Sequence, residues 1–145
     1  GVKVIEFNAR FGDPETEVVL PLLESDAYDV FYGIATGDEA MRQQGDKAMN
    51  WRNEATIGVV LASKGYPGSY AKGAVIEGVE LFDGPVFHMG TKNDNGVLKT
   101  NGGRVMMCIA TGKDIATARE KVYKEIEKIH CDNLFYRKDI AHWAL

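Results

Sequence analysis

The sequence predicts an α+β fold in which short antiparallel strands pack against flanking helices. From about residue 50, short runs rich in β-branched and aromatic residues alternate with glycine-rich turns, a pattern typical of strands joined by tight connections. Asn95-Gly96 separates two extended runs and is typical of a hairpin turn, which favours antiparallel pairing. Residues 114–130 carry apolar side chains three and four positions apart, so they predict a helix that covers the sheet.

The chain opens with a predicted strand over residues 2–10. Apolar side chains alternate there with Glu6, Asn8 and Arg10, so one face should pack and the other should carry polar groups. A strand that starts directly after Gly1, with no methionine before it, is unusual for a natural terminus. We therefore expect the chain to be a fragment.

Two helices are expected next. Asp13 can accept hydrogen bonds from free amides and Pro14 suits the first helical position, so residues 13–24 predict a helix. Residues 26–36 predict a second one, with an aspartate at its start. The polar, glycine-bearing residues 37–46 predict a turn or linker around a short helix, and they mark a candidate domain boundary.

The remaining strands are predicted from their composition and from the turns that separate them. They are expected at residues 55–62, 75–81, 86–89, 97–100 and 104–110. A final short helix should begin at Lys138.

Composition and charge argue against several function classes. The longest apolar run, residues 57–62, is far too short to cross a bilayer, so we expect no membrane association. The net charge is −4 at pH 7, and the basic residues are scattered among acids, so we expect no nucleic-acid partner. Cys108 and Cys131 are too few and too far apart for a disulfide framework or a metal site, which favours a reducing, cytoplasmic location.

The polar row of the first strand is the main candidate for chemistry. Side chains at alternate positions of a strand point the same way, roughly 6.6 Å apart along the chain, so Glu6 and Asn8 could both offer an oxygen to one small cation. Magnesium takes oxygen ligands, and Arg10 could meet an anion beside it. The structural alternative is a solvent-exposed Glu6–Arg10 pair on an open sheet face, with no role for Asn8. The row by itself is more typical of this structural alternative than of a metal site.

Five separated segments give the row a context. They resemble, in order and approximate spacing, the C-terminal part of the phosphoribosylamine–glycine ligases, also called glycinamide ribonucleotide synthetases, a family of the ATP-grasp superfamily. The segments are VIEFNARFGDPETEVVLPLL, VVLASKGYPGSYAKG, VFHMGTKNDNG, TNGGRV and FYRKDIAHWAL. The resemblance implies that residues 1–48 are the end of an ATP-grasp domain and residues 49–145 are a small antiparallel β-rich C-terminal domain.

The resemblance also implies a carbon–nitrogen ligase of de novo purine biosynthesis. ATP would phosphorylate the glycine carboxylate, and the amine of 5-phosphoribosylamine would attack the glycyl phosphate to give glycinamide ribonucleotide, ADP and phosphate. The family binds adenine and phosphates mainly through segments upstream of Glu6, and no segment here supplies them. The chain alone should therefore be inactive and should need the missing N-terminal part of the same protein as its partner.

Residue by residue, the resemblance implies a metal and catalytic set in the first segment. Glu6 and Asn8 match ligands of Mg²⁺, or of Mn²⁺ in its place. Arg10 matches the arginine near the glycine and the transferring phosphoryl group. Asp13 follows in the matching loop and is a second catalytic candidate, although capping the helix would explain it equally well.

A weaker set of substrate-binding candidates comprises Gly12, His88 and Arg104. Gly12 lies in the same loop as Asp13. Arg104 follows two glycines at a turn where amides and a guanidinium could meet an anion, and it is a candidate for holding the ribose phosphate. For His88 and for the Gly-Gly-Arg turn, a structural role is the commoner outcome.

Two other functions remain open from the sequence. A non-catalytic metabolite-binding or regulatory module could keep the fold without the chemistry, although the presence of Glu6, Asn8 and Arg10 together argues against decay. A carboxylase or another amide-forming ATP-grasp enzyme would share the metal row. The GYPG, HMGT and NGGR segments favour the glycine ligase.

Overall fold

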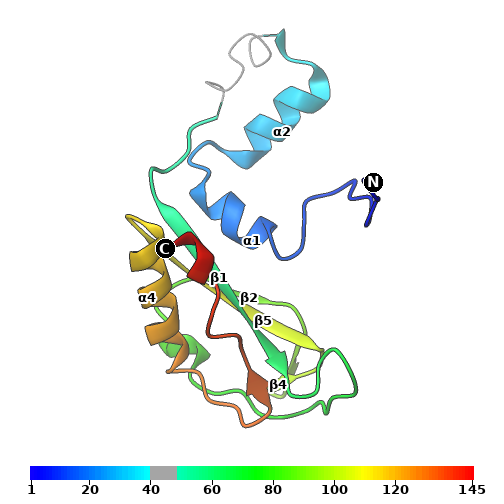
Figure 1. The fold of residues 1–145 in the computed structure, drawn as a ribbon, viewed down its shortest axis with the longest axis vertical. Coiled ribbons are helices and arrows are strands. Elements are labelled where there is room, and N and C mark those ends of the chain that lie inside the picture. Colours follow the sequence, from blue (N-terminus) through cyan, green and yellow to red (C-terminus); the bar gives the residue numbers. More distant parts are fainter. Residues whose placement is uncertain (40–48) are drawn as a thin grey trace.

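The computed structural model describes residues 1–39 and 49–145 (Figure 1). Short helices precede a mixed region of antiparallel strands and one long helix. The elements are α1 (Thr16–Val19), the 3-10 turn η1 (Leu20–Leu22), α2 (Ala27–Thr36), β1 (Ala55–Ser63), η3 (Val79–Leu81), β2 (Val86–His88), β3 (Thr91–Asp94), β4 (Val97–Thr100), β5 (Arg104–Gly112), α4 (Ile115–Ile126), β6 (Leu134–Phe135) and η4 (His142–Ala144). The predicted α+β class with antiparallel strands is confirmed.

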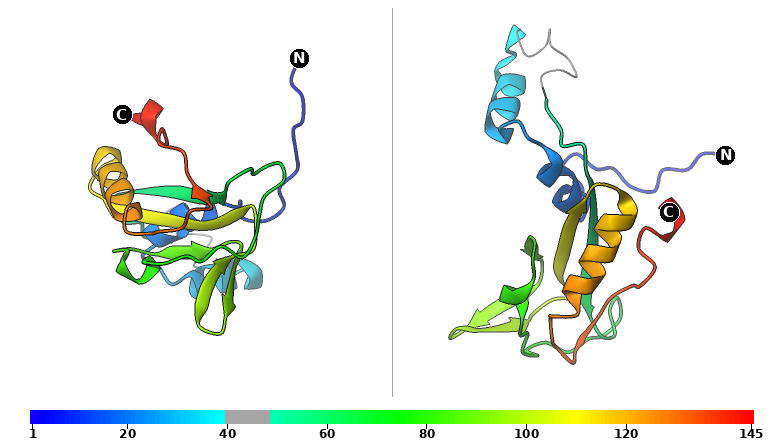
Figure 2. Two further views of the ribbon diagram at one scale, coloured as in Figure 1. Left: turned by 90° about the horizontal axis from the view of Figure 1, so that it is seen from below. Right: turned by 90° about the vertical axis from the view of Figure 1, so that its left-hand side faces the viewer.

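A four-stranded antiparallel sheet in the order β2-β5-β1-β6 forms the centre of the larger part. Its two long strands, β1 and β5, pair so that Ile57 faces Ala110 and Val59 faces Cys108. Both pairs belong to the core cluster on the face that α4 covers, and the alternation of β1 places every second side chain there. Figure 2 shows α4 against the sheet. This face is the hydrophobic core.

Helix α4 supplies the other half of that core through Ala118, Val122 and Ile126, each at most 1% exposed. Asp114 caps its start by accepting from the amide of Thr117 at 2.8 Å. Hydrogen bonding from the Thr117 side chain, and then from its amide, holds the pKa of the Asp114 carboxyl below its usual value. The core also holds Cys108, and burial raises the pKa of its thiol to about 12. The predicted helix over 114–130 is confirmed, but it ends at Ile126.

The opposite face of the sheet carries α1. Gly58 of β1 lies at this contact, where an added Cβ would approach Val18 Cγ1 to 2.8 Å and would also meet the end of Met107. The absence of a side chain at residue 58 therefore lets α1 lie close against the sheet. Residues 1–36 reach residues 49–145 through this contact, through a bridge between Leu23 and Trp51 and through one ion pair described below.

Residues 91–100 form a β-hairpin, as the sequence predicts. Strands β3 and β4 pair from Thr91–Thr100 to Asp94–Val97, and Asn95 and Gly96 at the turn both have positive φ. Predicted strands at 55–62, 86–89 and 104–110 are also confirmed as β1, β2 and β5 within two residues.

Two predictions for the later chain are wrong, and one short strand was missed. Residues 75–81 form bridges to β4 and to His130 and then the turn η3, because Gly78 adopts a positive φ that interrupts the strand. The C-terminal helix from Lys138 is only the three-residue turn η4. Strand β6, two residues long, is too short to leave an apolar pattern and was not predicted.

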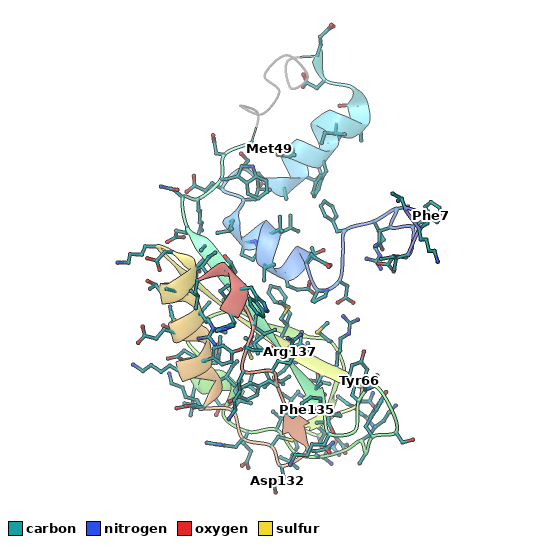
Figure 3. All side chains as sticks on the ribbon, in the orientation of Figure 1. Phe7, Met49, Tyr66, Asp132, Phe135 and Arg137 are labelled. Carbon is teal, nitrogen blue, oxygen red and sulfur yellow. The ribbon has the colours of Figure 1, made fainter. Side chains whose placement is uncertain are left out.

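The first predicted strand is also absent, because residues 2–10 have no neighbouring strand to pair with among the described residues. Val2, Ile5 and Phe7 are at least 90% exposed. Figure 3 shows Phe7 on a segment that extends away from the rest of the molecule. The helix predicted over 13–24 is shorter than expected, since α1 begins at Thr16 and Asp13 does not cap it.

Helix α2 agrees with its prediction. The Asp26 side chain accepts from the amide of Tyr28 at 2.7 Å, and Gly37 ends the helix with φ of 70°. Most of the predicted linker at 37–46, and the proposed boundary at residue 48, lie among or beside residues outside the described structure. Within the described residues, no helix combines the length and the apolar character needed to cross a bilayer.

Candidate functional site

The turn at residues 101–104 is the fixed point of the candidate site. Ser63, at the end of β1 and fully buried, donates from its hydroxyl to Gly102 O at 2.8 Å and from its amide to Gly103 O at 2.8 Å. The Asn101 amide donates to Gly90 O at 2.7 Å. The backbone of the turn is therefore held by Ser63, at the end of β1, and by Gly90, between β2 and β3.

Two further sequence segments pack on this turn. An added Cβ on Gly103 would come within 2.6 Å of Tyr66 Cε2 and 3.2 Å of Tyr70 Cε1, so only a residue without a side chain fits beneath these rings. Tyr66 belongs to GYPG and Gly90 to HMGT. The structure thus brings GYPG, HMGT and NGGR, which are separate in the sequence, to one place.

Arg104, the last residue of this turn and the first of β5, contacts the loop at residues 12–15. Its Nη1 donates to Asp13 Oδ1 at 2.9 Å and its Nη2 donates to Asp13 Oδ2 at 3.0 Å. Nη1 also lies 3.3 Å from the main-chain oxygen of Asp13. This forked pair joins residues 91 positions apart and leaves the Arg104 and Asp13 side chains 36% and 50% exposed.

The polar row of Glu6, Asn8 and Arg10 precedes this loop in the sequence. Asn8 Nδ2 donates to Glu6 Oε1 at 2.9 Å, so the two side chains lie on the same side of the chain, as their spacing predicts. Arg10 donates from Nη1 to Phe11 O at 3.0 Å. The structure therefore does not show the Glu6–Arg10 pair that a purely structural role of the row would predict. All three row residues are exposed.

A groove of about 480 Å³ lies under the loop, between α1 and β2. It is lined by Phe11, Gly12, Asp13, Thr16, Glu17, Leu20, Pro21 and Phe87. Glu17, one of these lining residues, has a carboxylate oxygen, Oε2, that is buried without a hydrogen-bond partner among the described residues. A larger hollow of about 570 Å³ lies elsewhere, beside the start of α4, and contains none of the predicted site residues.

The sequence-predicted residues, except His88, therefore fall into two groups. Gly12, Asp13 and Arg104 meet at the loop, whereas Glu6, Asn8 and Arg10 lie on the exposed segment before it. His88 ends β2, and its Nδ1 lies 2.9 Å from the Thr91 hydroxyl, a local contact that accounts for its side chain without a ligand. Their roles as ligands, catalysts or substrate contacts stay predictions.

The residues of the row fit a hard divalent cation. A carboxylate and an amide oxygen are the oxygen ligands that Mg²⁺ and Mn²⁺ accept, commonly with phosphates and water completing the shell. The Asn8–Glu6 hydrogen bond shows that the two side chains can converge. Among the described residues, no three His, Cys, Asp or Glu side chains gather closely enough to hold a metal by themselves.

Sequence reasoning missed the structural members of this site. Ser63 gave no signal, since a serine at a strand end is common. The pairing of Asp13 with Arg104 also went unnoticed, because each had a local explanation, helix capping for one and a turn for the other. The available clue was a charge of each sign directly after a glycine, Asp13 after Gly12 and Arg104 after Gly103.

Comparisons with known proteins define the class. The family model described as "Phosphoribosylglycinamide synthetase, C domain" matches residues 56–143. Proteins named phosphoribosylamine–glycine ligase from Halalkalibacterium halodurans and Pseudomonas aeruginosa are 49% and 44% identical over 100% and 99% of this chain. The crystal structure of the enzyme of that name from Thermotoga maritima is 37% identical, with a TM-score of 0.73 over 95% of this chain.

The fold and the matched segments thus define a C domain of the synthetases that make phosphoribosylglycinamide. This chain belongs to the phosphoribosylglycinamide synthetase family, and the family resemblance read from the sequence is confirmed. It covers 33% of each of these two relatives and 33% of the Thermotoga maritima chain. The chain therefore spans about one third of the length of the proteins that it matches.

Proposed function

We propose that this chain is the C-terminal part of a phosphoribosylamine–glycine ligase, a cytoplasmic enzyme of purine biosynthesis. The observation that carries the proposal is the identity of 49% to a ligase of that name over the whole chain, including the polar row and the loop. The preceding part of the same protein, absent here, would complete the end of the ATP-grasp domain that residues 1–48 form and would bind ATP.

Exposed apolar side chains support a missing partner surface. On residues 1–11, Val2, Ile5 and Phe7 are at least 90% exposed, and on α2 Tyr32 and Ile34 are 58% and 68% exposed. Apolar side chains gathered in this way are costly in water and usually face another protein surface. The preceding part of the ligase would cover them, and residues 2–10 would then gain the neighbouring strand that the sequence pattern predicts.

The proposed reaction has two steps. A glycine carboxylate oxygen attacks the γ-phosphorus of ATP, the bond to the β-phosphate oxygen breaks, and ADP leaves. The phosphoribosylamine nitrogen then attacks the acyl carbon, the carbon–oxygen bond to phosphate breaks, and the nitrogen loses a proton. Phosphate is a much better leaving group than the hydroxide that a free carboxyl group would have to lose. The carboxylate must therefore be phosphorylated before the amine can attack.

The row residues have distinct roles in this proposal. Glu6 and Asn8 would hold Mg²⁺ or Mn²⁺, which when bound neutralises charge on the nucleotide phosphates. Arg10 would place its guanidinium beside the acyl phosphate, where a fixed positive charge stabilises the oxygens that gain charge. Closure by the β-rich region would keep water from hydrolysing the acyl phosphate.

Isotope transfer in the full-length protein tests the reaction. With glycine labelled by ¹⁸O in its carboxylate, one labelled oxygen should appear in the released phosphate, and release should require phosphoribosylamine. Unlabelled phosphate would contradict the acyl-phosphate route. Binding of metabolites by residues 1–145 alone, with no turnover by the longer protein, would instead support a regulatory module.

The metal assignment has its own variants. Glu6→Ala and Asn8→Ala should each lower turnover by on the order of a hundredfold at limiting Mg²⁺ without unfolding the protein, because each removes one oxygen ligand. Glu120→Ala, an exposed glutamate on α4, is the matched control. Wild-type kinetics of Glu6→Ala at limiting Mg²⁺ would remove the assignment.

A further inference from the structure

We infer that Asp13 and Arg104 form a positioning pair, which fixes the polar row relative to the β-rich region. The inference rests on the proposed function and deepens it. In this inference the two residues act by binding each other and so holding the loop in place. Neither of them contacts the substrate.

The first argument is the shape of the contact. Arg104 presents two nitrogens to the two carboxylate oxygens of Asp13, at 2.9 and 3.0 Å, which is the forked geometry in which a guanidinium fixes orientation as well as charge. Its third contact is to the main-chain oxygen of Asp13 at 3.3 Å. Arg104 thus holds the backbone of the loop, which a purely electrostatic partner would not do.

The second argument is the rigidity of the base. The residues immediately before Arg104 are held by the hydroxyl and amide of buried Ser63. Arg104 itself begins β5, a strand that pairs on both sides in the central sheet. The guanidinium therefore starts from one of the most fixed points of the β-rich region, whereas its partner lies on a loop.

The third argument is the distance along the chain from the pair to the row. Arg10 precedes Asp13 by three residues, a span of at most about 11 Å. Within that span Phe11 contacts the ring of Phe31 with centroids 5.6 Å apart, and Gly12 O accepts from the Thr16 amide at 3.0 Å. Fixing Asp13 therefore limits where Arg10, and the metal ligands before it, can lie.

A double-mutant cycle in the full-length ligase tests the pair. Asp13→Asn and Arg104→Gln should each lower kcat by on the order of tenfold to a hundredfold, with KM for glycine nearly unchanged, because small displacements of reacting groups are costly. The double variant should be no worse than either single one, since both changes break the same contact. The unfolding temperature of each variant should stay close to that of the wild type, because exposed ion pairs add little stability.

The matched control is Arg137→Gln. Arg137 makes a forked contact of the same kind to Asp139, at 2.9 and 2.7 Å, but joins residues two positions apart. Its loss should leave turnover unchanged. Arg104→Lys keeps the charge without the fork, and it should behave like Arg104→Gln if orientation is what matters.

Three results would overturn the inference. A rise confined to KM for phosphoribosylamine in Arg104→Gln would make Arg104 a substrate ligand. Loss of activity in Asp13→Asn with a normal Arg104→Gln would make Asp13 a group that contacts substrate. Wild-type kinetics in both would leave the pair without a role in the site.

Binding of Mn²⁺ separates this inference from the proposed function. Titration of the full-length protein with Mn²⁺, followed by electron paramagnetic resonance, needs no turnover. Weaker binding in both Asp13→Asn and Arg104→Gln, and not in Arg137→Gln, supports the pair even if wild-type protein shows no ligase activity. If the wild-type protein is an active ligase and both variants keep its Mn²⁺ binding and its turnover, the positioning role of the pair is refuted. The proposed function would then still stand.

Discussion

The β-rich region and residues 1–36 differ in where their apolar side chains lie. In residues 49–145 they meet between α4 and the central sheet, and Ile126 is 1% exposed. In residues 1–36 many point to solvent, and Ile5 is 98% exposed. The β-rich region thus contains the surface that its own core needs, whereas the first region carries apolar side chains that no surface among the described residues covers.

This contrast separates two kinds of sequence signal. Periodicity in α4 matches a surface within the same chain, so pattern and structure agree. The alternation in residues 2–10 is equally regular, but no strand of the described residues pairs with it. A pattern therefore shows which side of a segment will be buried, and the presence of a partner decides whether the segment becomes a strand.

The largest expected difference is in the free energy of unfolding when one isoleucine is truncated in each region. Ile126→Ala should lower the free energy of unfolding of residues 1–145 by about 2–5 kcal/mol, because it leaves a cavity in the core. Ile5→Ala should change it by less than about 0.5 kcal/mol, since the side chain is already in water. Urea unfolding measures both.

The same pair of variants in the full-length ligase sharpens the comparison. Ile5→Ala should there cost about 2 kcal/mol or more, because the side chain would be buried by the preceding part. An unchanged free energy of unfolding would show that residues 2–10 stay exposed in the complete protein.

A smaller effect is expected at the start of α2. Asp26→Ala removes the acceptor for the Tyr28 amide and should destabilise this helix by about 1 kcal/mol. Hydrogen exchange of residues 27–36 should quicken while exchange in β1 and β5 stays unchanged, because the hydrophobic cluster between α4 and the sheet contains no residue of α2. Faster exchange in both regions would show that they unfold as one unit.

The smallest effect is a pH dependence within the β-rich region. Lys128, whose Nζ lies 2.5 Å from Glu125 Oε2, and then the Asp83 amide hold the pKa of the Glu125 carboxyl below its usual value of 4.5. A carboxyl with a lowered pKa in the folded state stabilises the fold above 4.5, and this contribution is lost as the pH falls through the lowered pKa.

Glu125→Gln should therefore unfold at a lower temperature than wild type at pH 7, with the difference shrinking as the pH falls below 4.5. Calorimetry at several pH values measures this, and Glu127→Gln, on an exposed neighbour, is the control. A difference that stays constant down to pH 3 would contradict the role of the charge.

The sequence by itself determined the elements whose hydrogen bonds and packing are local or strongly periodic. These are β1, β5, the hairpin at 91–100, α2 with its aspartate cap, and α4. The motif order also determined the family, and the i, i+2 spacing of Glu6 and Asn8 placed their side chains together. For the hairpin, α2, α4 and the Glu6–Asn8 pair, neighbours in the sequence are also neighbours in space. Strands β1 and β5 were determined from their own composition and turns, and their pairing joins distant segments.

Only the tertiary structure decided how distant segments meet. Asp13 pairs with Arg104, 91 positions away, in place of capping α1, because a guanidinium fixed at the start of β5 offers two donors to its carboxylate. Ser63 joins the NGGR turn to β1, and Tyr66 packs over Gly103. Such contacts depend on chain topology, and no local pattern of residues encodes which turn a loop will meet.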